Sequence, residues 1–428
     1  MIQKPKGTYD TYGIESRKIR YLNELFTLLM DKYNYSQVRT PIFENSELFH
    51  RGVGESSDIV TKETYDFTDR GNRNMTLRPE GTAGVVRSYI ENKMYGDATK
   101  PTKLWYNGFM YRYERPQSGR FREFNQFGVE VIGSSSAMLD AEVISIPVNF
   151  YKLLGLKGIK VNINTLGDLE SRNNYRQALK DYFKPYLNQL CTDCNNRFEK
   201  NPLRILDCKI DHDKDIMKNA PKMIDYLNEE SKIHYEKVKK YLEELGIEYV
   251  ENPNLVRGLD YYTHTVFEVE AEVEGFGSQN VLCGGGRYDL LVEMLDGPST
   301  PAVGFALGIE RLLTALDYEN IDIVEEKSLD AYIIPMSDNE SAYAFKLLNH
   351  LRMNGFNSDI DYIGRKIGSN FKQADRFNSK YVIIIGEEEI KTNIITIKDN
   401  KTKEEYKIDA NSIISFLDER IIDDHEKI

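Results

Sequence analysis

Two aromatic-rich segments joined by a polar turn decide how the fold is interpreted. The first is Leu104-Trp-Tyr-Asn-Gly-Phe-Met-Tyr-Arg-Tyr113, the turn is Arg115-Pro-Gln-Ser-Gly-Arg120, and the second is Phe124-Asn-Gln-Phe-Gly-Val-Glu-Val-Ile132. Aromatic and β-branched residues favour strands, and a turn containing glycine, proline and serine favours a hairpin. We therefore predict a long antiparallel hairpin. Arg112 and Glu114 would share one face of its first strand, because alternate residues of a strand point the same way.

Two pairs of polar residues near this hairpin each admit two interpretations. Arg112 could hold a phosphate while Glu114 accepts from an amine or supports Mg²⁺, or the two could form an ordinary ion pair on the sheet. Glu80 and Thr82, which flank Gly81, could face a bound ammonium or belong to a simple turn after Pro79. From that stretch alone, the turn is the favoured interpretation.

The surrounding sequence predicts a mixed domain with a helical insertion. Apolar residues at helical spacing predict a helix over residues 15–33. Residues 171–250 are charged and largely helical, with a helix over 222–245 closed by Gly246. Strands are predicted again at 263–271, 281–283 and 302–306, with the glycine-rich stretch 284–288 between the last two. Because strand-rich sequence resumes after residue 250, the helical stretch is interpreted as an insertion.

A second domain is expected after a charged linker at residues 319–328. Strands at 331–335, 358–363 and 381–385 alternate with helices at 340–354 and from about Ser369, and a hairpin spans 393–408 before a last helix. This alternation is typical of a separate α/β domain of about 100 residues. We expect the domains to comprise residues 1–325 and 326–428.

Composition excludes some classes of protein. The chain has 428 residues, 40% of them hydrophobic, which is enough for two or three domain cores. No run of about 18 apolar residues predicts a membrane span, and residues 1–10 lack a secretory apolar core. Four cysteines do not form a dense disulfide framework, which suits a reducing cytosol. We expect a cytoplasmic protein that does not bind membranes.

The net charge of −12 does not exclude a nucleic-acid partner. A phosphate backbone responds to nearby charges, because the Debye length is about 10 Å. Residues 103–123 carry five cations and two anions, and residues 363–380 carry five cations and one anion. Charge runs are usually solvated faces, so these two windows favour RNA binding only modestly.

Several of these segments together resemble class II aminoacyl-tRNA synthetases. Arg112-x-Glu114, the turn and Arg120-Phe-Arg-Glu-Phe124 resemble motif 2 of that family, and Gly304-Phe-Ala-Leu-Gly-Ile-Glu-Arg311 resembles motif 3. The first helix, strand and Pro41 resemble motif 1. Leu255-Val-Arg-Gly-Leu-Asp-Tyr-Tyr262 and Gly284-Gly-Gly-Arg-Tyr-Asp289 narrow the resemblance to the histidine enzymes, over essentially the whole chain.

The resemblance implies an α+β fold: a class II antiparallel sheet core with the helical insertion, then a C-terminal α/β anticodon-binding domain. It implies ligation of L-histidine to histidine tRNA through a histidyl-adenylate, with ATP as substrate and Mg²⁺ as cofactor. Motif 1 would build a homodimer. Catalysis would rest on Arg257 and Arg112, which would neutralise charge at the α-phosphate.

The resemblance also implies binding roles for individual residues. Histidine would contact Glu80, Gly81, Thr82, Arg112, Gln126, Glu130, Arg257, Tyr261 and Tyr262. ATP would contact Arg112, Glu114, Arg120, Phe124 and Arg311. Arg115, Gln117 and Arg120 would approach the acceptor end of the tRNA, and the second basic window suits the anticodon-binding domain.

The sequence has three further interpretations. The regulatory subunit of an ATP phosphoribosyltransferase resembles the synthetase core but typically lacks the anticodon domain and parts of the site. A class II enzyme for threonine or proline would not be expected to carry the stretch 257–262. A pure RNA-binding or scaffold protein would not need such an arrangement of arginines and carboxylates.

The cysteines offer a possible zinc site. Cys191, Cys194, Cys208 and His212 have a spacing that could ligate zinc. The insertion of the resembled family is not generally a metal site, so the favoured expectation is reduced thiols and no metal.

Overall fold

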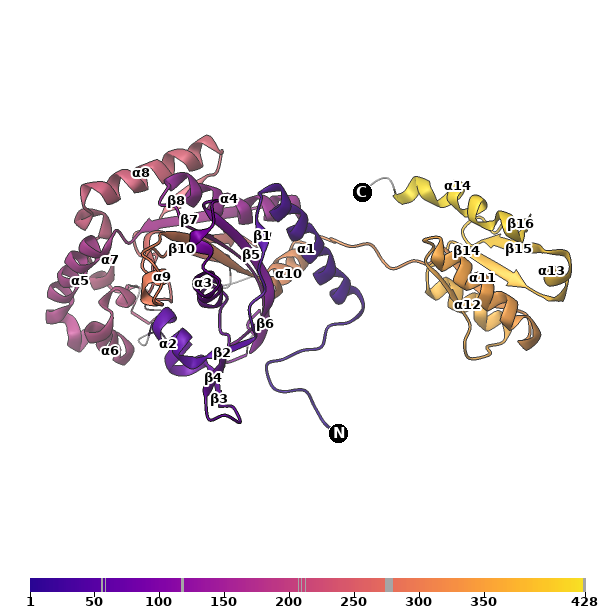
Figure 1. The fold of residues 1–428 in the computed structure, drawn as a ribbon, viewed down its shortest axis with the longest axis horizontal. Coiled ribbons are helices and arrows are strands. Elements are labelled where there is room, and N and C mark those ends of the chain that lie inside the picture. The colour runs from indigo at the N-terminus through magenta and orange to yellow at the C-terminus, as the bar shows by residue number, and fades with distance from the viewer. Residues whose placement is uncertain are drawn as a thin grey trace. The chain divides into compact units, whose positions relative to one another are not determined.

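The structure is a computed structural model that describes residues 1–54, 57, 59–116, 119–206, 208, 210–211, 213–273 and 280–425. Contacts divide the chain into two compact units, 1–324 and 325–428 (Figure 1). Among the described residues, no helix combines the length and apolarity that crossing a membrane requires.

The first unit is built around an eight-stranded sheet with the order β1-β5-β6-β11-β10-β9-β7-β8. These strands span Ser36–Gln37, Thr102–Tyr111, Glu123–Ile132, Ala302–Gly308, Val281–Arg287, Thr263–Ala271, Ile159–Thr165 and Tyr249–Glu251. The predicted hairpin is confirmed: β5 and β6 pair antiparallel in a register that sets Leu104 opposite Glu130. Every pairing from β5 to β7 is antiparallel, and only the short edge strands β1 and β8 add parallel pairs.

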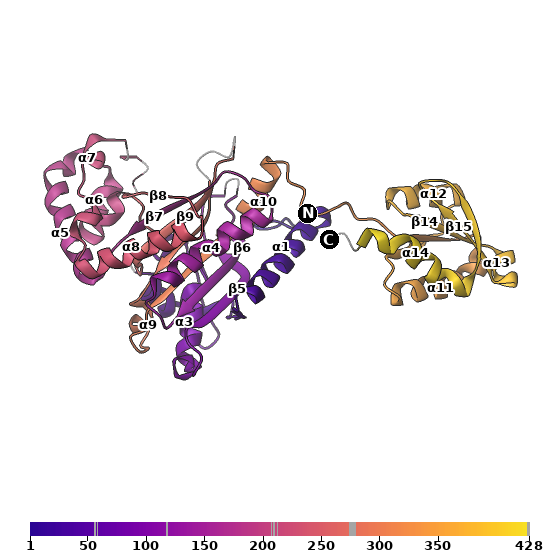
Figure 2. The same cartoon turned by 90° about the horizontal axis from the view of Figure 1, so that it is seen from above.

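One face of the sheet carries the main core. Along β6, Phe127, Val129 and Val131 point into it, and Val303 and Phe305 of β11 do the same. Helices α1 (Gly13–Lys32), α4 (Ala137–Leu153), α8 (Glu229–Glu244) and α10 (Ile309–Tyr318) contribute the other side of that core. Figure 2 shows α1, α4 and α8 running across the sheet. The even-numbered residues of β6 and β11 therefore face away from these helices, because side chains alternate along a strand.

The opposite face is bordered by shorter elements. Helices α2 (Ser46–Val53), α3 (Thr82–Glu91) and α9 (Leu291–Met294) pack on one another there. A small sheet of β2 (Phe43–Asn45), β4 (Asn74–Leu77) and β3 (Tyr65–Thr68) adjoins them. The π-helical turn Ile59–Glu63 and the 3₁₀ turn Met94–Gly96 connect these elements. This border leaves an open area over β6, β10 and β11 that becomes the pocket described below.

The insertion consists of α5 (Leu169–Phe183), α6 (Thr192–Lys200) and α7 (Asp215–Lys218), which gather beside α8 at one side of the unit (Figure 1). The 3₁₀ turns Lys184–Gln189, Pro202–Ile205 and Met223–Tyr226 join them. The predicted helix over 222–245 starts too early: α8 begins at Glu229, because Leu227 is extended and the Asn228 side chain caps the helix by accepting from Ser231 N. Gly246, with φ of +64°, ends it as expected.

The glycine-rich stretch after Cys283 also differs from the prediction. Gly284, Gly285 and Gly286 were expected to follow a strand that ends at residue 283, but β10 continues through them to Arg287. They pair with β11 on one side and β9 on the other. Glycine lowers strand propensity, so local sequence underestimates a strand that two neighbours hold in place.

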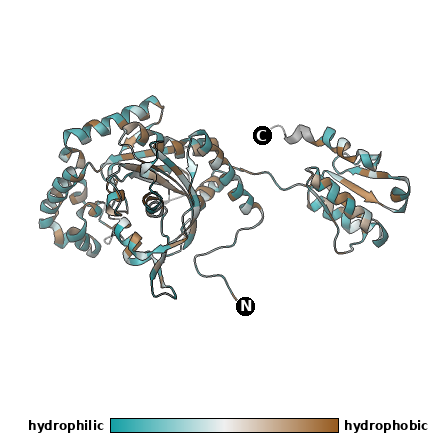
Figure 3. Cartoon of the chain, in the orientation of Figure 1, coloured by the Kyte–Doolittle hydropathy of each residue, from teal (hydrophilic) through white to brown (hydrophobic). Residues whose placement is uncertain are grey.

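The second unit is a five-stranded sheet with the order β13-β12-β14-β15-β16. The strands span Ser358–Ile360, Ala331–Pro335, Tyr381–Ile385, Ile394–Asp399 and Glu405–Asp409. Helices α11 (Ser341–Met353) and α14 (Ile413–His425) pack on one face, and α12 (Ile367–Arg376) packs on the other. Brown, hydrophobic residues run along the sheet (Figure 3). The unpredicted helix α13 (Glu387–Thr392) follows β14.

A buried ion pair joins β10 to α4. Arg287 and Asp140 are each 0% exposed, with Nη2 and Nε of Arg287 donating to the carboxylate at 2.7 and 3.0 Å. Arg287 also donates to the carbonyls of Ser134 and Ser136, at 3.0 and 3.1 Å. Burial opposes the ionised carboxylate, but Arg287 and His234, whose Nε2 lies 3.3 Å from Asp140, together outweigh burial and lower the pKa of Asp140. The pair thus fixes the end of β10 that leads into the pocket.

We predict that Arg287→Leu destabilises the first unit by about 3–5 kcal/mol, because it leaves the Asp140 charge buried without its partner. Urea unfolding followed by Trp105 fluorescence measures this, since Trp105 is the single tryptophan and lies buried in this unit. The double variant Arg287→Leu/Asp140→Leu should recover much of the loss. Arg73→Ala, which removes an exposed pair with Asp69, is the matched control and should cost less than about 1 kcal/mol. Equal losses in Arg287→Leu and Arg73→Ala would contradict the assignment.

Candidate active site

A pocket opens over the face of the sheet that points away from α1 and α4. The even-numbered residues Phe124 and Gln126 of β6 and Gly304, Ala306 and Gly308 of β11 form its base. The surrounding wall is contributed by α3, by the turn after β5, by the segment before β9 and by α10. The principal side chains that line it are Glu80, Thr82, Tyr106, Arg112, Glu114, Arg120, Arg257, Tyr261, Tyr262, Tyr288, Glu310 and Arg311.

Glycine backbone makes room for the charged groups of this pocket. A Cβ on Gly304 would overlap the carboxylate of Glu130, and a Cβ on Gly284 would overlap the guanidinium of Arg257. A Cβ on Gly128 would similarly overlap the ring of Tyr106. Side chains of β5 and β6, and Arg257 of the segment before β9, therefore lie directly over glycine backbone of neighbouring strands.

Two buried carboxylates mark one end of the pocket. Glu130, 1% exposed, accepts hydrogen bonds from the hydroxyls of Thr82, at 2.7 Å, and Tyr288. Glu80, 4% exposed, accepts from the backbone amides of Thr82 and Ala83, at 2.7 and 2.9 Å. These amides begin α3, so Glu80 satisfies donors at a helix N-terminus. The turn after Pro79 is therefore short, because Thr82 already begins α3.

Burial raises the pKa of Glu130 to about 8. The hydrogen bonds from Tyr288 and Thr82 favour its ionised form, but they do not outweigh desolvation, and the nearby Glu80 raises the pKa further. Burial also raises the pKa of Glu80. A cationic or hydrogen-bond-donating ligand stabilises the ionised form of such buried carboxyl groups, because it supplies positive charge or hydrogen bonds in place of water.

Further polar groups complete this end. The amide oxygen Oε1 of Gln126 is buried and has no hydrogen-bond partner among the described residues. Tyr261 and Tyr262 are 3% and 6% exposed, with ring centroids 4.7 Å apart. Tyr106 packs against Gly81 so closely that a Cβ on Gly81 would overlap its ring. An unpaired buried acceptor is costly in the free protein and is suited to a ligand N–H.

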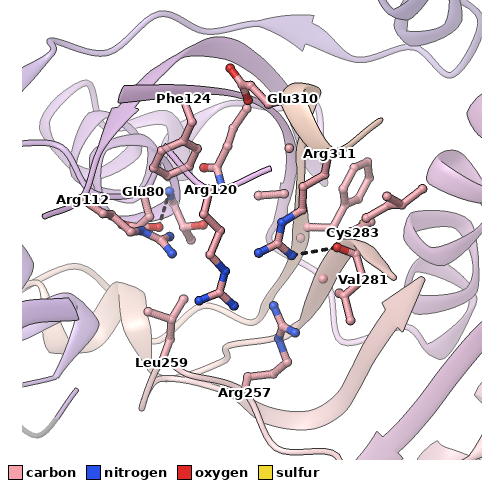
Figure 4. Close-up of a pocket in the computed structure, with 18 of the residues that line it drawn as sticks. Glu80, Arg112, Arg120, Phe124, Arg257, Leu259, Val281, Cys283, Glu310 and Arg311 are labelled. Carbon is pink, nitrogen blue, oxygen red and sulfur yellow. Dashed lines mark hydrogen bonds between the residues drawn. The ribbon is translucent and has the colours of Figure 1, made fainter. Parts of the chain in front are cut away.

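Four arginines converge on the other end (Figure 4). The backbone fixes two of them: Arg112 Nε donates to Pro79 O at 2.8 Å, and Arg311 Nη1 donates to Val281 O at 2.9 Å. Arg120 lies 3.4 Å from the Glu114 carboxylate. Arg257 pairs with Glu268 of β9. Burial, together with the nearby cation of Arg120, lowers the pKa of Arg311. An anionic ligand with several oxygens would relieve this concentration of positive charge.

Fifteen site residues were predicted, and all but four of them line the pocket. Glu130 and Gly81 lie beneath it against Gly304 and Tyr106. Arg115 is exposed outside the pocket, and Gln117 lies outside the described residues. The predicted strand continues only to Tyr111, so Arg112 and Glu114 follow β5 rather than sharing its face. Their side chains still lie near each other, with Arg112 Nη1 3.9 Å from the Glu114 carboxylate.

Sequence reasoning missed four contributors. Tyr288 donates to Glu130, Tyr106 packs on Gly81, and Glu268 pairs with Arg257. Glu310 accepts from Tyr9 OH at 2.6 Å and from Asn125 N at 2.8 Å, which joins the N-terminal segment to the pocket. Tyr288 and Glu310 lay within quoted motifs and could have been noticed there. Nothing in the local sequence marked Tyr106 or Glu268.

A family model described as "Histidyl-tRNA synthetase" matches residues 7–312, and one described as "Anticodon binding domain" matches residues 330–420. A histidine--tRNA ligase of Staphylococcus aureus strain N315 is 52% identical over 418 residues, which cover 97% of this chain and 100% of that protein. The chain belongs to the histidyl-tRNA synthetase family. The resemblance seen in the sequence is thereby confirmed.

Solved structures agree with membership of the histidyl-tRNA synthetase family. The apo histidyl-tRNA synthetase of S. aureus superposes with a TM-score of 0.84 at 46% identity, covering 97% of this chain and 100% of that one. A Bacillus halodurans protein described as "ATP phosphoribosyltransferase regulatory subunit/histidyl-tRNA synthetase" reaches a TM-score of 0.63 at 23% identity, covering 90% and 98%. At that identity the second likeness shows the fold alone.

The raised pKa of Glu130 predicts how stability depends on pH in the ligand-free protein. Glu130 contributes its full stabilisation at pH values below the ordinary pKa of glutamate. Between that pH and about 8 the unfolded chain ionises this group while the folded protein keeps it protonated, so the free energy of unfolding falls as pH rises. Glu130→Gln cannot ionise, so its melting temperature relative to the unsubstituted protein should rise by several degrees between pH 5 and pH 9. Thermal unfolding at several pH values tests this. Glu293→Gln, at an exposed position of α9, is the control and should show no such trend. A pH-independent difference for Glu130→Gln would contradict the prediction.

Proposed function

We propose that this chain joins histidine to its tRNA, using ATP and forming a histidyl-adenylate in the pocket. One observation carries the proposal: a single pocket divides its charged groups between four arginines that line it and two buried carboxyl groups, Glu80 in its lining and Glu130 beneath it. That division suits a reaction between a polyphosphate and an amino acid. Membership of the histidyl-tRNA synthetase family identifies the amino acid as histidine.

Histidine occupies the carboxylate end. Its α-ammonium group is held by Glu80, Thr82 and Gln126, whose Oε1 is buried and unpaired in the free protein. Its imidazole meets Glu130 and Tyr262, with Tyr261 beside them. An apolar amino acid of similar size would leave these buried groups without partners, so the site would reject it. Gly81 keeps this end open by accommodating the ring of Tyr106.

ATP occupies the arginine end. Arg112 binds the α-phosphate and the histidine carboxylate, Arg311 lies towards the adenine and terminal phosphate, and Phe124 stacks on the base. The Arg112 guanidinium lies 5.3 Å from the Phe124 ring centre, so phosphate-binding and base-binding groups adjoin each other. Glu114 points into the pocket and offers carboxylate oxygens, the ligands that Mg²⁺ prefers. When bound, Mg²⁺ would supply further neutralisation of phosphate charge.

Adenylate formation brings two anions together. A carboxylate oxygen of histidine attacks the α-phosphorus, a new P–O bond forms, and the bond to the pyrophosphate oxygen breaks. The histidine carboxylate needs no base, because it is already ionised. Arg257 and Arg112 stabilise the charge that gathers on the α-phosphate, and preorganised charges of this kind are usually the largest catalytic contribution. In the second step a terminal tRNA hydroxyl attacks the histidyl carbonyl and AMP leaves.

The tRNA contacts two separate regions in this proposal. Arg115, exposed beside the pocket, and the loop residues Gln117 and Arg120 approach the acceptor end. On the C-terminal unit, Lys366, Lys372 and Arg376 are exposed along α12, and Tyr362 is 62% exposed just before it. Cations next to an exposed aromatic ring suit unpaired bases and their phosphates. The match of residues 330–420 to an anticodon-binding domain supports this assignment.

A homodimer is part of the proposal, with motif 1 at its interface. The motif 1 region places exposed apolar side chains at Leu28 of α1, at Ile42 just before β2 and at Phe43 in β2, with exposed fractions of 59%, 46% and 53%. Such residues are commonly covered by a partner surface. Mg²⁺, the homodimer and a cytoplasmic location all belong to this proposal.

Exchange of pyrophosphate into ATP tests the reaction directly. We expect exchange with histidine alone among the twenty amino acids, followed by charging of histidine tRNA. Exchange with threonine or proline would instead favour another class II synthetase. Folded protein that exchanges with none of the twenty would indicate a regulatory paralogue and overturn the proposal.

Arg257→Ala tests the proposed division between catalysis and binding. Loss of one preorganised charge should slow adenylate formation by roughly 10²–10³-fold, while histidine affinity changes far less. Single-turnover kinetics and calorimetric histidine binding measure the two effects. Arg257→Lys should also fail to restore the rate, since lysine cannot replace a planar bidentate contact. The exposed Arg73→Ala controls for loss of an arginine. Equal losses of rate and of histidine affinity would disprove the catalytic role of Arg257.

A further inference from the structure

Three cysteines and an aspartate meet in the insertion, away from the pocket. Cys191, Cys194, Cys208 and Asp211 each offer one ligand atom, and these four atoms all lie within 4.8 Å of one another. Cys194 and Asp211 are 0% exposed and Cys208 is 4% exposed. The first segment, 191–194, enters the start of α6, and the rest of α6 and a 3₁₀ turn separate it from the second segment, 208–211. His212, which the sequence offered as a fourth ligand, lies outside the described residues.

The two segments share one local geometry. In the first, the amide of Cys194 points at Cys191 Sγ, with N and Sγ 3.5 Å apart. In the second, the amide of Asp211 points at Cys208 Sγ at 3.4 Å. In both cases the donor follows the sulfur by three residues. An amide directed at sulfur stabilises a thiolate over a thiol, and the thiolate is the form that binds metal.

The distances across the cluster match those of a tetrahedral metal centre. Thiolates about 2.3 Å from a tetrahedral zinc lie about 3.8 Å from each other, and a carboxylate oxygen lies about 3.6 Å from a thiolate. Cys191 Sγ and Cys208 Sγ are 3.7 Å apart. Cys208 Sγ and Asp211 Oδ2 are also 3.7 Å apart. Sulfur atoms from the two segments thus already stand at the separation that a shared zinc would impose.

We propose that Cys191, Cys194, Cys208 and Asp211 form a structural zinc site in the insertion. Three thiolates and one carboxylate suit zinc, because soft sulfur ligands select it over Mg²⁺ or Ca²⁺ and four ligands leave no open position. Lys214, whose Nζ lies 2.7 Å from the other oxygen of Asp211, offsets part of the negative charge. Cys191 N donates to Asp211 Oδ2 at 2.8 Å and orients that carboxylate towards the sulfurs. A metal ion also relieves the burial of an ionised Asp211 beside thiols that could ionise.

A zinc ion at this site would stabilise the segment that packs behind the residues lining the pocket. The chain between the two ligand segments carries Asn201, whose side-chain amide donates to Asp260 at 2.9 Å. It also carries Leu203 and Leu206, which belong to the same hydrophobic cluster as Leu255 and Tyr261. Zinc would close this chain into a loop and hold it against the segment that contains Arg257. The role is structural, since none of the four ligands lines the pocket.

Metal analysis of the full chain tests the proposal. Protein purified under reducing conditions, without a metal-affinity tag, should contain about one zinc per chain by mass spectrometry. Cobalt exchanged for zinc should give the visible absorption of a tetrahedral site and the near-ultraviolet bands of thiolate ligation. Chelator treatment should lower the melting temperature of the unit that contains Trp105, and added zinc should restore it.

Matched variants separate the site from adventitious binding. Cys194→Ser and Asp211→Asn should each lose most of the zinc. The matched controls Cys283→Ser, which alters the one cysteine outside the cluster, and Asp193→Asn, an exposed carboxylate between two of the ligands, should retain it. Zinc that is lost equally in all four variants would overturn the proposal.

A disulfide is the principal competing outcome for the cluster. If Cys191 and Cys208 form a disulfide in protein kept under reducing conditions, the intact mass falls by about two hydrogen masses and two proposed ligands are no longer available. That result would overturn the proposal. Folded, reduced protein that takes up neither zinc nor cobalt would overturn it as well.

Discussion

The pocket depends on glycine residues, which have no side chain, at the centre of the sheet. Gly128, Gly284 and Gly304 lie on three adjacent strands, and a side chain at any of them would occupy space now taken by Tyr106, Arg257 or Glu130. The side chains of Tyr106, Arg257 and Glu130 can therefore pack directly against the sheet, close to one another and partly shielded from solvent. Electrostatic interactions are stronger in such a partly desolvated place, which gives both ends of the pocket their chemical character.

The same arrangement makes the free protein less stable than it could be. Glu130 and Glu80 are buried with raised pKa values, and four arginines line the same pocket. The Arg287–Asp140 pair is different, because Arg287 donates both to the Asp140 carboxylate and to backbone carbonyl groups. It anchors β10 where the strand leads into Tyr288, and Tyr288 in turn donates to Glu130. A buried structural ion pair thus supports the strand end that carries Tyr288, a hydrogen-bond donor to Glu130.

Residues of the insertion also hold pocket-lining segments in place. Asn201 reaches Asp260, and Arg172 of α5 donates to the carbonyl of Tyr262 at 2.7 Å. The residues that would contact imidazole and α-phosphate are consequently held from behind by a segment that contributes nothing to the pocket lining. A zinc site in that segment would hold its loop by metal–ligand bonds, which a small helical element with a limited core requires more than the main sheet does.

The sequence by itself determined the hairpin of β5 and β6, the helix α1, the helical insertion and the family. Strand alternation, helical spacing and ordered motifs are local properties, so they can be recognised without knowing what packs against them. Tertiary structure alone decided that β10 runs through three glycines, that Glu80 caps α3, and that Tyr106 and Glu268 belong to the site. It also placed Cys191 beside Cys208, which spacing left open. Each of these depends on contacts between residues distant in sequence, and only the packed sheet and insertion set those distances.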